Sequence, residues 1–585
     1  MKKYLLVLAG LYCVLSYALA EHPDYPELKK SDANIIGHVL DKKTKEHLPY
    51  ITIALKGTTI GTVTDATGHY FLKNLPEGNF ILEVSSVGYK TVTRNVTLKK
   101  GKTLEEDFEI EEDAIALDGV VVSANRSETT RRLAPTLVNV VDLKLFETTN
   151  SSTLSQGLNF QPGVRVETNC QNCGFQQVRI NGLDGPYTQI LIDSRPVFSA
   201  LSGVYGLEQI PASMIERVEV MRGGGSALFG SSAIAGTINI ITKEPLRNSG
   251  QLSHTLTALG GGSSFDNNTS LNASLVTDDH RAGLYIFGQN RHRSGYDYDG
   301  DGFTELPKLK NQTVGFRSYL KTSTYSKLTF EYHHMQEFRR GGDMLDRPPH
   351  EAHIAEQLQH SIDGGSLKFD YFSPDEKNRL SIFASAANTD RDSYYGPGND
   401  PLKAYGKTTD LTAMGGAQYV HTFDKCFFMP SDLTAGLEYN RDRLKDNMWG
   451  YDRHTDQTVN IYSAFLQNEW KNDRWGILIG GRLDKHNMVD NVIFSPRANL
   501  RFNPTQNINL RLSYSSGFRA PQAFDEDMHI ENVGGTVAMI ERAKNLKEEK
   551  SQSFSASADM YHRFGVFQTN FLIEGFYTRL TEDRK

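Results

Sequence analysis

The C-terminal half of the chain alternates apolar and polar residues along runs of about ten positions. In the run at 508–515 the apolar positions are Ile508, Leu510, Leu512 and Tyr514. The positions between them are Asn509, Arg511, Ser513 and Ser515. Side chains of a strand point alternately to its two faces, so one face is apolar and the other polar. From position 249 onward this pattern predicts antiparallel strands of a transmembrane β-barrel with a wet interior. A soluble β-solenoid would also alternate, but it would show a short internal repeat, which we do not find.

The length of this region sets an expected strand number. Roughly 335 residues follow the start of the alternation, and about 20 residues per strand with its connection gives roughly 16 strands. Outer-membrane barrels normally finish on an aromatic residue of their last, closing strand. This chain instead ends on the polar run 581–585, directly after an expected strand. We therefore expect the barrel, residues 249–585, to be C-terminally incomplete in this sequence.

The N-terminal region has a different pattern of short strands and frequent turn residues. Residues 34–110 contain strand-like runs bounded by Gly, Pro, Asp and Asn. The segments 64–68 and 76–79 have the composition of hairpin turns. Short strands at this spacing predict a small β-sandwich.

Composition and the N-terminus indicate export. Residues 1–20 carry Lys2 and Lys3, an apolar run and Ala18-Leu19-Ala20, which predicts a cleaved secretory signal. No later stretch has 18 consecutive apolar residues, so we expect no transmembrane helix. Lys and Arg number 63 against 70 Asp and Glu, and the net charge of −7 gives no signal for nucleic acid.

Residues 215–243, IERVEVMRGGGSALFGSSAIAGTINIITK, hold charge within a strand-like pattern. A first strand would place Ile215, Arg217 and Glu219 on one face and Glu216, Val218 and Val220 on the other. Three glycines at 223–225 would then turn the backbone, and a β-branched second strand would follow at 237–242. Charges in such a unit suit a compact sheet enclosed by a polar wall, where buried charges find partners.

This stretch closely resembles the end of the plug domain of TonB-dependent outer-membrane receptors. The matching residues of the motif include Arg217, Glu219, Arg222, Gly223 and Gly224. Further plug-like segments lie at 154–164, 178–183, 189–197 and 207–211. The resemblance implies a mainly β protein, with an α+β plug at 126–246 inside a large antiparallel barrel of the 22-stranded type.

Residues 34–110 resemble the carboxypeptidase regulatory-like domain, an immunoglobulin-like sandwich that precedes many such receptors in Bacteroidetes-type bacteria. We find no nucleophile, base or metal cluster in it. The resemblance implies a spacer or interaction module in the periplasm of a Gram-negative cell.

The segment 114–125 is short, apolar and β-prone, and it directly precedes the plug. Such a segment can add as a strand to an open sheet edge. Its position matches the family's TonB box, which implies the TonB–ExbB–ExbD complex as partner and Leu117, Val120, Val121 and Val122 as contact residues. The alternative is one more plug strand.

Cys170 and Cys173 form a CxxC pair that could be a disulfide, a redox pair or half of a zinc site. The secreted context favours a structural disulfide. Direct contact with the cargo or a metal is the alternative, because the pair is expected at the outward tip of the plug.

Histidines gather between positions 333 and 360, beside several arginines, in a region that we expect to be rich in loops. His350 and His353 are candidates for binding a metal, a porphyrin or an anionic chelate, and solvated loop histidines are the alternative. Arg519 lies in Phe518-Arg519-Ala520-Pro521, and His529 follows it. These residues resemble the FRAP box and the iron-ligating histidine of haem receptors, but the second box is degenerate and FRAP also occurs in siderophore and cobalamin receptors.

Acidic residues at alternate positions, Asp297, Asp299 and Asp301, precede Glu305. They resemble the first half of a calcium loop, although Lys308 stands where the closing glutamate would be. The alternatives are an outer loop ordered by calcium and a plain acidic surface loop. No other cofactor is implied.

Together these features predict an outer-membrane importer of a metal chelate such as a ferric siderophore, haem or cobalamin. Import of an oligosaccharide or peptide with a lipoprotein partner, or a signalling role, is the alternative. We expect no enzymatic activity, because the sequence shows no nucleophile–base pair and no complete metal set.

Overall fold

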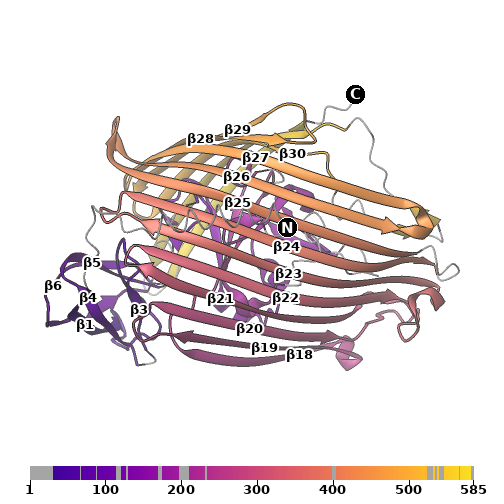
Figure 1. Cartoon of the computed structure of the whole chain (residues 1–585), viewed down its shortest axis with the longest axis horizontal. Coiled ribbons are helices and arrows are strands. Elements are labelled where there is room, and N and C mark those ends of the chain that lie inside the picture. The colour runs from indigo at the N-terminus through magenta and orange to yellow at the C-terminus, as the bar shows by residue number, and fades with distance from the viewer. Residues whose placement is uncertain are drawn as a thin grey trace, which may run out of the picture.

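The computed structural model describes residues 30–581 except 66, 87–88, 113–119, 127–128, 169–173, 175, 197–209, 231–232, 398–403, 524–530, 534–535, 539–545 and 565–566. The predicted signal therefore lies outside the described residues. Three β-rich parts follow one another along the chain: a small N-terminal domain, a plug and a wide curved sheet around the plug (Figure 1). None of the described helices is long and apolar enough to cross a membrane.

The N-terminal domain is a sandwich of two four-stranded sheets. One sheet contains β4 (His69–Pro76), β1 (Lys30–Asp41), β7 (Thr103–Glu105) and β8 (Phe108–Ile110). The other contains β3 (Gly61–Val63), β2 (Thr52–Leu55), β5 (Gly78–Ser85) and β6 (Val92–Leu98). Apolar side chains from both sheets, including Ile35, Ile53, Leu82 and Phe108, fill the space between them.

The prediction of hairpins at 64–68 and 76–79 is wrong. The first turn joins β3 to β4 and the second joins β4 to β5, but β4 pairs with β1 while β3 and β5 pair with β2. Both turns therefore cross from one sheet to the other. Turn residues fix a local reversal of the chain, and they do not specify which sheet receives the next strand.

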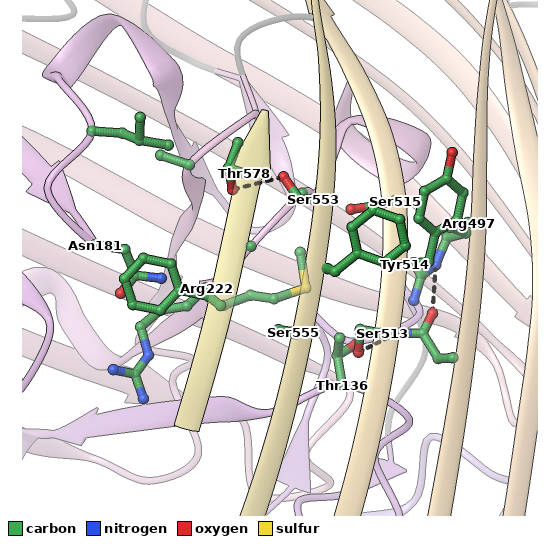
Figure 2. A pocket seen from close by; sticks show the side chains of 18 residues that line it. Thr136, Asn181, Arg222, Arg497, Ser513, Tyr514, Ser515, Ser553, Ser555 and Thr578 are labelled. Carbon is green, nitrogen blue, oxygen red and sulfur yellow. Dashed lines mark hydrogen bonds between the residues drawn. The ribbon is translucent and has the colours of Figure 1, made fainter. Parts of the chain in front are cut away.

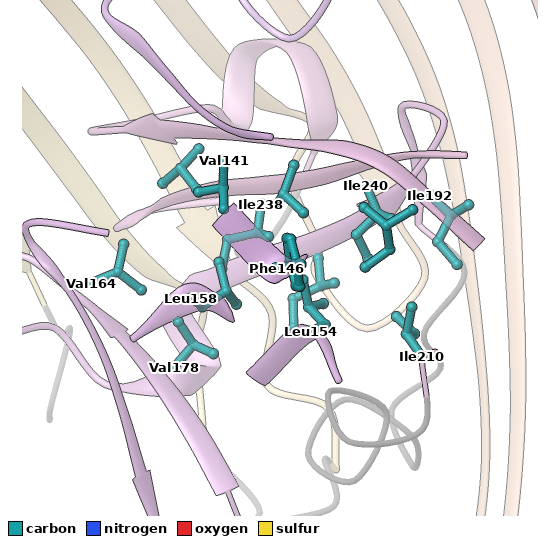
Figure 3. Packing of buried hydrophobic residues seen from close by; sticks show 14 of the residues in the cluster. Val141, Phe146, Leu154, Leu158, Val164, Val178, Ile192, Ile210, Ile238 and Ile240 are labelled. Atoms are coloured by element: carbon teal, nitrogen blue, oxygen red, sulfur yellow. The ribbon is translucent and has the colours of Figure 1, made fainter. Parts of the chain in front are cut away.

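The plug is built on a five-stranded sheet with two short helices packed on it. The sheet order is β11 (Val138–Asp142), β16 (Ile215–Arg222), β17 (Gly236–Thr242), β14 (Thr188–Ile192) and β15 (Arg195–Pro196). The other elements are β9 (Val120–Val121), β10 (Thr129–Thr130), α2 (Leu143–Thr148), α3 (Leu154–Leu158), β12 (Val164–Thr168), β13 (Gln176–Ile180), η1 (Gly185–Tyr187), η2 (Ala212–Met214) and α5 (Ser226–Phe229). Figure 3 shows Phe146, Leu154 and Leu158 of the helices against Ile238 and Ile240 of the sheet.

The opening strand of the plug motif differs from the expected alternation. Ile215 shares the apolar core with Val218 and Val220 instead of the polar face with Arg217 and Glu219. A register irregularity between Ile215 and Arg217, where β16 pairs with β17, changes the face to which Ile215 points.

Fifteen long strands, each antiparallel to the next, form the outer sheet in sequence order from β18 to β34. They are β18 (Ser249–Leu259), β19 (Ser264–Val276), β20 (Ala282–Arg293), β21 (Lys308–Ser323), β22 (Ser326–Gly342), β23 (Ile354–Phe372), β24 (Asn378–Pro397), β25 (Tyr405–Cys426), β26 (Met429–Met448), β27 (Arg453–Lys471), β28 (Trp475–His486), β29 (Ile493–Thr505), β30 (Ile508–Arg519), β33 (Glu549–Phe564) and β34 (Phe567–Thr581). The connections contain η3 (Gly260–Gly262), η4 (Pro349–Glu351), η5 (Trp449–Tyr451) and the small hairpin of β31 (Glu531–Val533) and β32 (Thr536–Ala538).

Alternation along these strands matches the predicted barrel wall. On β30 the apolar Leu510 and Leu512 are exposed on the outside, while Asn509 and Arg511 are buried inside. The mainly β fold with a plug and a large antiparallel sheet is thus confirmed.

The two ends of the outer sheet differ in the length of their connections. At one end the turns are short, as between β21 and β22, and the N-terminal domain lies against this end (Figure 1). There the Thr59 N–H donates to the Thr324 carbonyl at 2.8 Å, and the Thr62 hydroxyl contacts His280 Nε2 at 3.0 Å. The longer connections, including the one with η4, lie at the opposite end.

Candidate functional site

Residues 120–126, which we call the coupling segment, lie between the plug sheet and the outer wall. A single carboxylate of the plug motif holds the middle of this segment. Glu219 Oε2 accepts hydrogen bonds from the Val122 N–H at 2.9 Å, the Ser123 N–H at 2.8 Å and the Ser123 hydroxyl at 2.7 Å. Glu219 is fully buried, and its other oxygen accepts from Arg217 Nε at 3.0 Å. These hydrogen bonds offset the cost of removing the carboxylate from water.

The same segment also joins the plug through backbone pairing. Val121 pairs with Thr129 and Val120 with Thr130, so β9 and β10 form a two-stranded antiparallel sheet. The side chain of Val121 is buried. Of the predicted TonB-box residues, Leu117 lies outside the described residues. The docking role stays a prediction, and in this structure Val120–Val122 occupy the plug.

The outer wall holds the next three residues of the segment by their backbone carbonyls. Side chains of β29, β27 and β25 donate to consecutive carbonyls at 3.0 Å: Arg497 to Ala124, Gln467 to Asn125 and Gln418 to Arg126. The Asn125 amide in turn donates to Glu469 Oε2 at 2.6 Å. The coupling segment is therefore held by plug and wall together.

A chain of buried charges continues from the end of this segment. The Arg126 guanidinium pairs with Glu438 of β26, which also accepts from Arg482 of β28 at 2.7 Å. Arg482 further donates to Asp484 at 2.8 Å and to the Leu228 carbonyl of the plug at 3.1 Å. Removal of Glu438 would leave Arg126 and Arg482 without the carboxylate that they share in this buried interface.

The rest of the plug motif contacts the last strands of the sheet. Arg222 pairs with Glu574 of β34 at 2.5 Å. A Cβ on Gly224 would lie 2.1 Å from the Ser515 hydroxyl, so the wall approaches closer than any side chain allows. Figure 2 shows the pocket between these elements, with Arg222 on the plug side and Ser515 and Ser553 on the wall.

Toward the end of the sheet with long connections, an arginine of the wall contacts the plug at Gly174, which we call the plug tip. The carbonyl of Gly174 accepts from Arg339 of β22 at 3.3 Å. Arg339 also pairs with Glu337 at 2.7 Å. Cys170 and Cys173 lie outside the described residues, so their role stays a prediction.

The expectation of one loop-rich histidine region is wrong in part. His333, His334 and His360 lie on β22 and β23, because the strands there are long. His350 and His353 do lie in the connection that contains η4. His350 Nδ1 contacts the Tyr405 hydroxyl at 2.9 Å.

His353 pairs with a carboxylate of the same connection. Its Nδ1 lies 2.5 Å from Asp343 Oδ2, and the Ile354 N–H donates to Asp343 Oδ1 at 3.0 Å. Burial raises the pKa of Asp343, but these two hydrogen bonds outweigh it and hold the pKa below its ordinary value. The imidazole is thus already committed to an ionised partner.

Arg519 ends β30, and its guanidinium lies 5.7 Å from the ring centre of Tyr187 on η1 of the plug. This contact places the predicted ligand residue at the boundary of wall and plug. His529 lies outside the described residues, so the haem-box interpretation stays a prediction.

The predicted calcium loop connects β20 to β21. Carboxylate oxygens of Asp297, Asp299 and Glu305 lie within 4.8 Å of one another. Asp301 is not part of this cluster, and like the other three carboxylates it accepts a backbone N–H, that of Phe303 at 2.8 Å. Calcium binding stays a prediction for all four residues.

Sequence reasoning missed the wall residues that hold the coupling segment. Glu438, Gln467, Glu469 and Arg497 occupy inward positions of their strands, like many other polar residues of the sheet. Nothing in their local sequence distinguishes them, because their role depends on contacts more than 300 residues away along the chain.

Family models match almost the whole described chain. Residues 35–122 match a CarboxypepD_reg-like domain, and residues 130–237 match a TonB-dependent receptor plug domain. Residues 235–582, more than half of the chain, match the TonB dependent receptor-like β-barrel.

Individual relatives are more distant. A vitamin B12 transporter, BtuB, of Vibrio vulnificus strain CMCP6 is 25% identical over 424 residues, covering 70% of this chain and 64% of its own length. The chain thus spans about two thirds of the length of that relative, and 39% of the length of BtuB from strain YJ016.

Solved structures share the fold. The siderophore receptor PirA of Acinetobacter baumannii matches with a TM-score of 0.63 at 18% identity, covering 77% of this chain and 78% of PirA. A mutant of the ferric enterobactin receptor PfeA of Pseudomonas aeruginosa matches with a TM-score of 0.62 at 18% identity, covering 77% and 71%. With the plug, the wall and the matched models in agreement, the chain belongs to the family of TonB-dependent receptors, which are outer-membrane proteins.

Proposed function

We propose that the protein is an importer that carries a metal chelate across the outer membrane and is opened by a pull from TonB. An outer membrane holds no ATP, so the work must arrive through a mechanical link. The family consists of transporters and receptors, and we propose no catalytic step for this chain.

The coupling segment is the observation that carries the proposal. It overlaps the β-prone run 114–125, in which Leu117 and Val120–Val122 would add as a strand to a sheet edge of TonB once the segment leaves the plug. It is tied to the plug through Glu219 and to the wall through Glu438 and Arg497. A force applied ahead of residue 120 would therefore act first on the contacts that seat the plug.

The arginine at the outer boundary of plug and wall favours a cargo that is anionic or rich in oxygen atoms. Arg519 lies at the outer end of β30 beside Tyr187, and guanidinium groups suit carboxylate and phosphate groups. The similar proteins are named a vitamin B12 transporter, a siderophore receptor and a ferric enterobactin receptor. Ferric siderophores, haem and cobalamin are the cargo candidates, and ExbB and ExbD would complete the energy-transducing complex.

Val121→Pro tests the coupling role. Proline removes the N–H that a docked strand would donate, so we expect uptake to fall to background while chelate binding at the cell surface is retained. Growth with iron, haem or cobalamin as the limiting nutrient measures uptake in a strain that carries the intact receptor or its variant.

Val121→Ala is the matched control, because it shortens the same side chain and keeps the N–H. We expect it to support growth. Normal uptake by Val121→Pro would contradict the coupling role, and growth on none of the three nutrients with the intact receptor would contradict the cargo class.

A further inference from the structure

Three histidines from separate segments meet on the surface of the N-terminal domain. His38 lies on β1 and His69 on β4, where the two residues are direct cross-strand partners. His47 comes from the turn after β1. The ring centres lie 5.0 Å apart for His38 and His47, 4.9 Å for His47 and His69, and 5.7 Å for His38 and His69.

The ring centres have the separations that three imidazoles take around one metal ion, although their ring nitrogens do not yet meet within 4.8 Å of one another. A zinc–nitrogen bond of about 2.0–2.1 Å places each ring centre about 3.2 Å from the ion, and tetrahedral angles then separate the ring centres by about 5 Å. The rings lie tilted or stacked, with planes 25–54° apart, rather than turned toward one centre. His47 is exposed, so its side chain is free to rotate toward an ion shared with the other two rings.

Two of the rings already carry the outer contacts that metal-binding histidines use. His38 Nδ1 lies 2.9 Å from Asp107 Oδ1. A carboxylate there accepts the Nδ1 proton and leaves the lone pair on Nε2. Asp107 Oδ1 also accepts the His38 backbone N–H at 3.0 Å, which fixes the carboxylate beside the ring.

His69 has an equivalent arrangement with a hydroxyl group. Its Nδ1 lies 3.0 Å from Thr67 Oγ1, and that hydroxyl donates its own proton to Asp65 Oδ1 at 2.7 Å. The hydroxyl proton is thus committed, so the oxygen accepts from Nδ1–H and Nε2 again keeps the lone pair. The Thr67 hydroxyl also holds the pKa of Asp65 below its ordinary value.

The backbone allows the third histidine to approach. Gly68 has φ +79°, and a Cβ at this position would lie 2.8 Å from the Cβ of His47. A side chain at position 68 would therefore push His47 away from the other two rings.

We propose that His38, His47 and His69 form a binding site for a divalent transition-metal ion of the zinc class, with Nε2 of His38 and His69 as ligands and Asp107 and Thr67 as orienting residues. Three imidazoles leave the fourth position of a tetrahedral ion open to water or to a partner's side chain. The proposal does not depend on the proposed import function. The N-terminal domain lies at the end of the sheet with short turns, away from the outer connections that would meet the cargo (Figure 1).

Zinc titration of the full chain tests the site. The protein, purified in detergent without a histidine tag, is titrated with Zn²⁺ in a calorimeter, and Co²⁺ is added separately to record the visible absorption of tetrahedral cobalt. We expect one site that His47→Ala weakens at least tenfold, with loss of the cobalt bands. His47 is exposed, so this substitution leaves the fold intact.

Two further variants separate this site from other histidines. Asp107→Asn removes the charge that orients His38, and we expect it to weaken Zn²⁺ binding roughly tenfold. His254→Ala is the matched control, because His254 is also exposed and contacts a hydroxyl, Thr269 Oγ1, at 2.8 Å. We expect it to bind Zn²⁺ as the unmodified protein does. Equal affinity of the His47→Ala variant and the unmodified protein, or unchanged cobalt bands in that variant, would overturn the proposal.

Discussion

The N-terminal sandwich and the interface between plug and wall are held together by opposite kinds of contact. The sandwich encloses apolar side chains such as Ile53, Leu82 and Phe108, which are removed from water almost completely. The interface around the coupling segment instead joins charged and polar groups, including Glu219, Glu438 and Arg482.

This difference determines which of the two contacts can open reversibly. An apolar core loses stability when it opens, because its surface meets water. Polar groups of an interface can exchange each other for water at a small net free energy, provided that all of them become hydrated together. A plug seated by such contacts is held in one position at rest and can leave it under force.

The largest effect is expected where one buried charge partners two others. Glu438→Ala leaves Arg126 and Arg482 without their shared carboxylate, which we expect to destabilise plug seating by about 3–5 kcal/mol. The rate of trypsin cleavage within residues 113–128 of the detergent-solubilised protein measures it. Asp456→Ala removes a 3.5 Å pair with Lys445 that is 62% and 45% exposed, and it should change stability by about 0–1 kcal/mol. Equal cleavage of the two variants would contradict the buried-charge explanation.

A slightly smaller effect is expected in the sandwich, and it should stay local. Ile53→Ala opens a cavity in the apolar core and should lower the free energy of unfolding of this domain by about 2–5 kcal/mol. Domain-resolved hydrogen exchange should show faster exchange in residues 30–110 and no change in the plug. Phe71, 42% exposed, provides the control, since Phe71→Ala should have an effect near zero. Faster exchange in the plug of the Ile53→Ala variant would show that the two regions are not independent.

The smallest effect is expected in the acidic connection between β20 and β21. If calcium orders residues 294–307, its removal by a chelator should raise protease cleavage there about twofold, with no change elsewhere. Asp297→Asn should abolish this dependence on calcium, and Asp301→Asn should retain it, because Asp301 lies apart from the other three carboxylates. If calcium does not change the cleavage of the unmodified protein, the calcium prediction is wrong and the connection is a plain acidic surface loop.

Much of the fold could be predicted because the wall follows a strict period of two. The exposed Leu510 and Leu512 and the buried Arg511 repeat the pattern of their sequence. The face of Ile215 could not be predicted, because it depends on a bulge that only the pairing of β16 with β17 reveals.

The sites were less predictable, because they join residues far apart in the chain. Glu219 was recognised from its motif, but its partners Val122 and Ser123 lie about a hundred residues earlier. His38, His47 and His69 have no metal-site spacing in the sequence. They meet only because β1 pairs with β4 and the intervening turn folds back over both.

The most direct test of the import mechanism is to lock the coupling segment to the plug. Val121 and Thr129 are direct cross-strand partners. The Cβ atoms of such partners lie close enough for a disulfide when the pair is of the non-hydrogen-bonded type. In cells that carry the Val121→Cys/Thr129→Cys variant, uptake of a labelled chelate is measured before and after a mild reductant, with each single variant as control. We predict that the oxidised variant binds chelate but imports none, and that reduction restores uptake. Unchanged uptake with the disulfide formed would show that β9 need not leave the plug, and it would contradict the proposed mechanism.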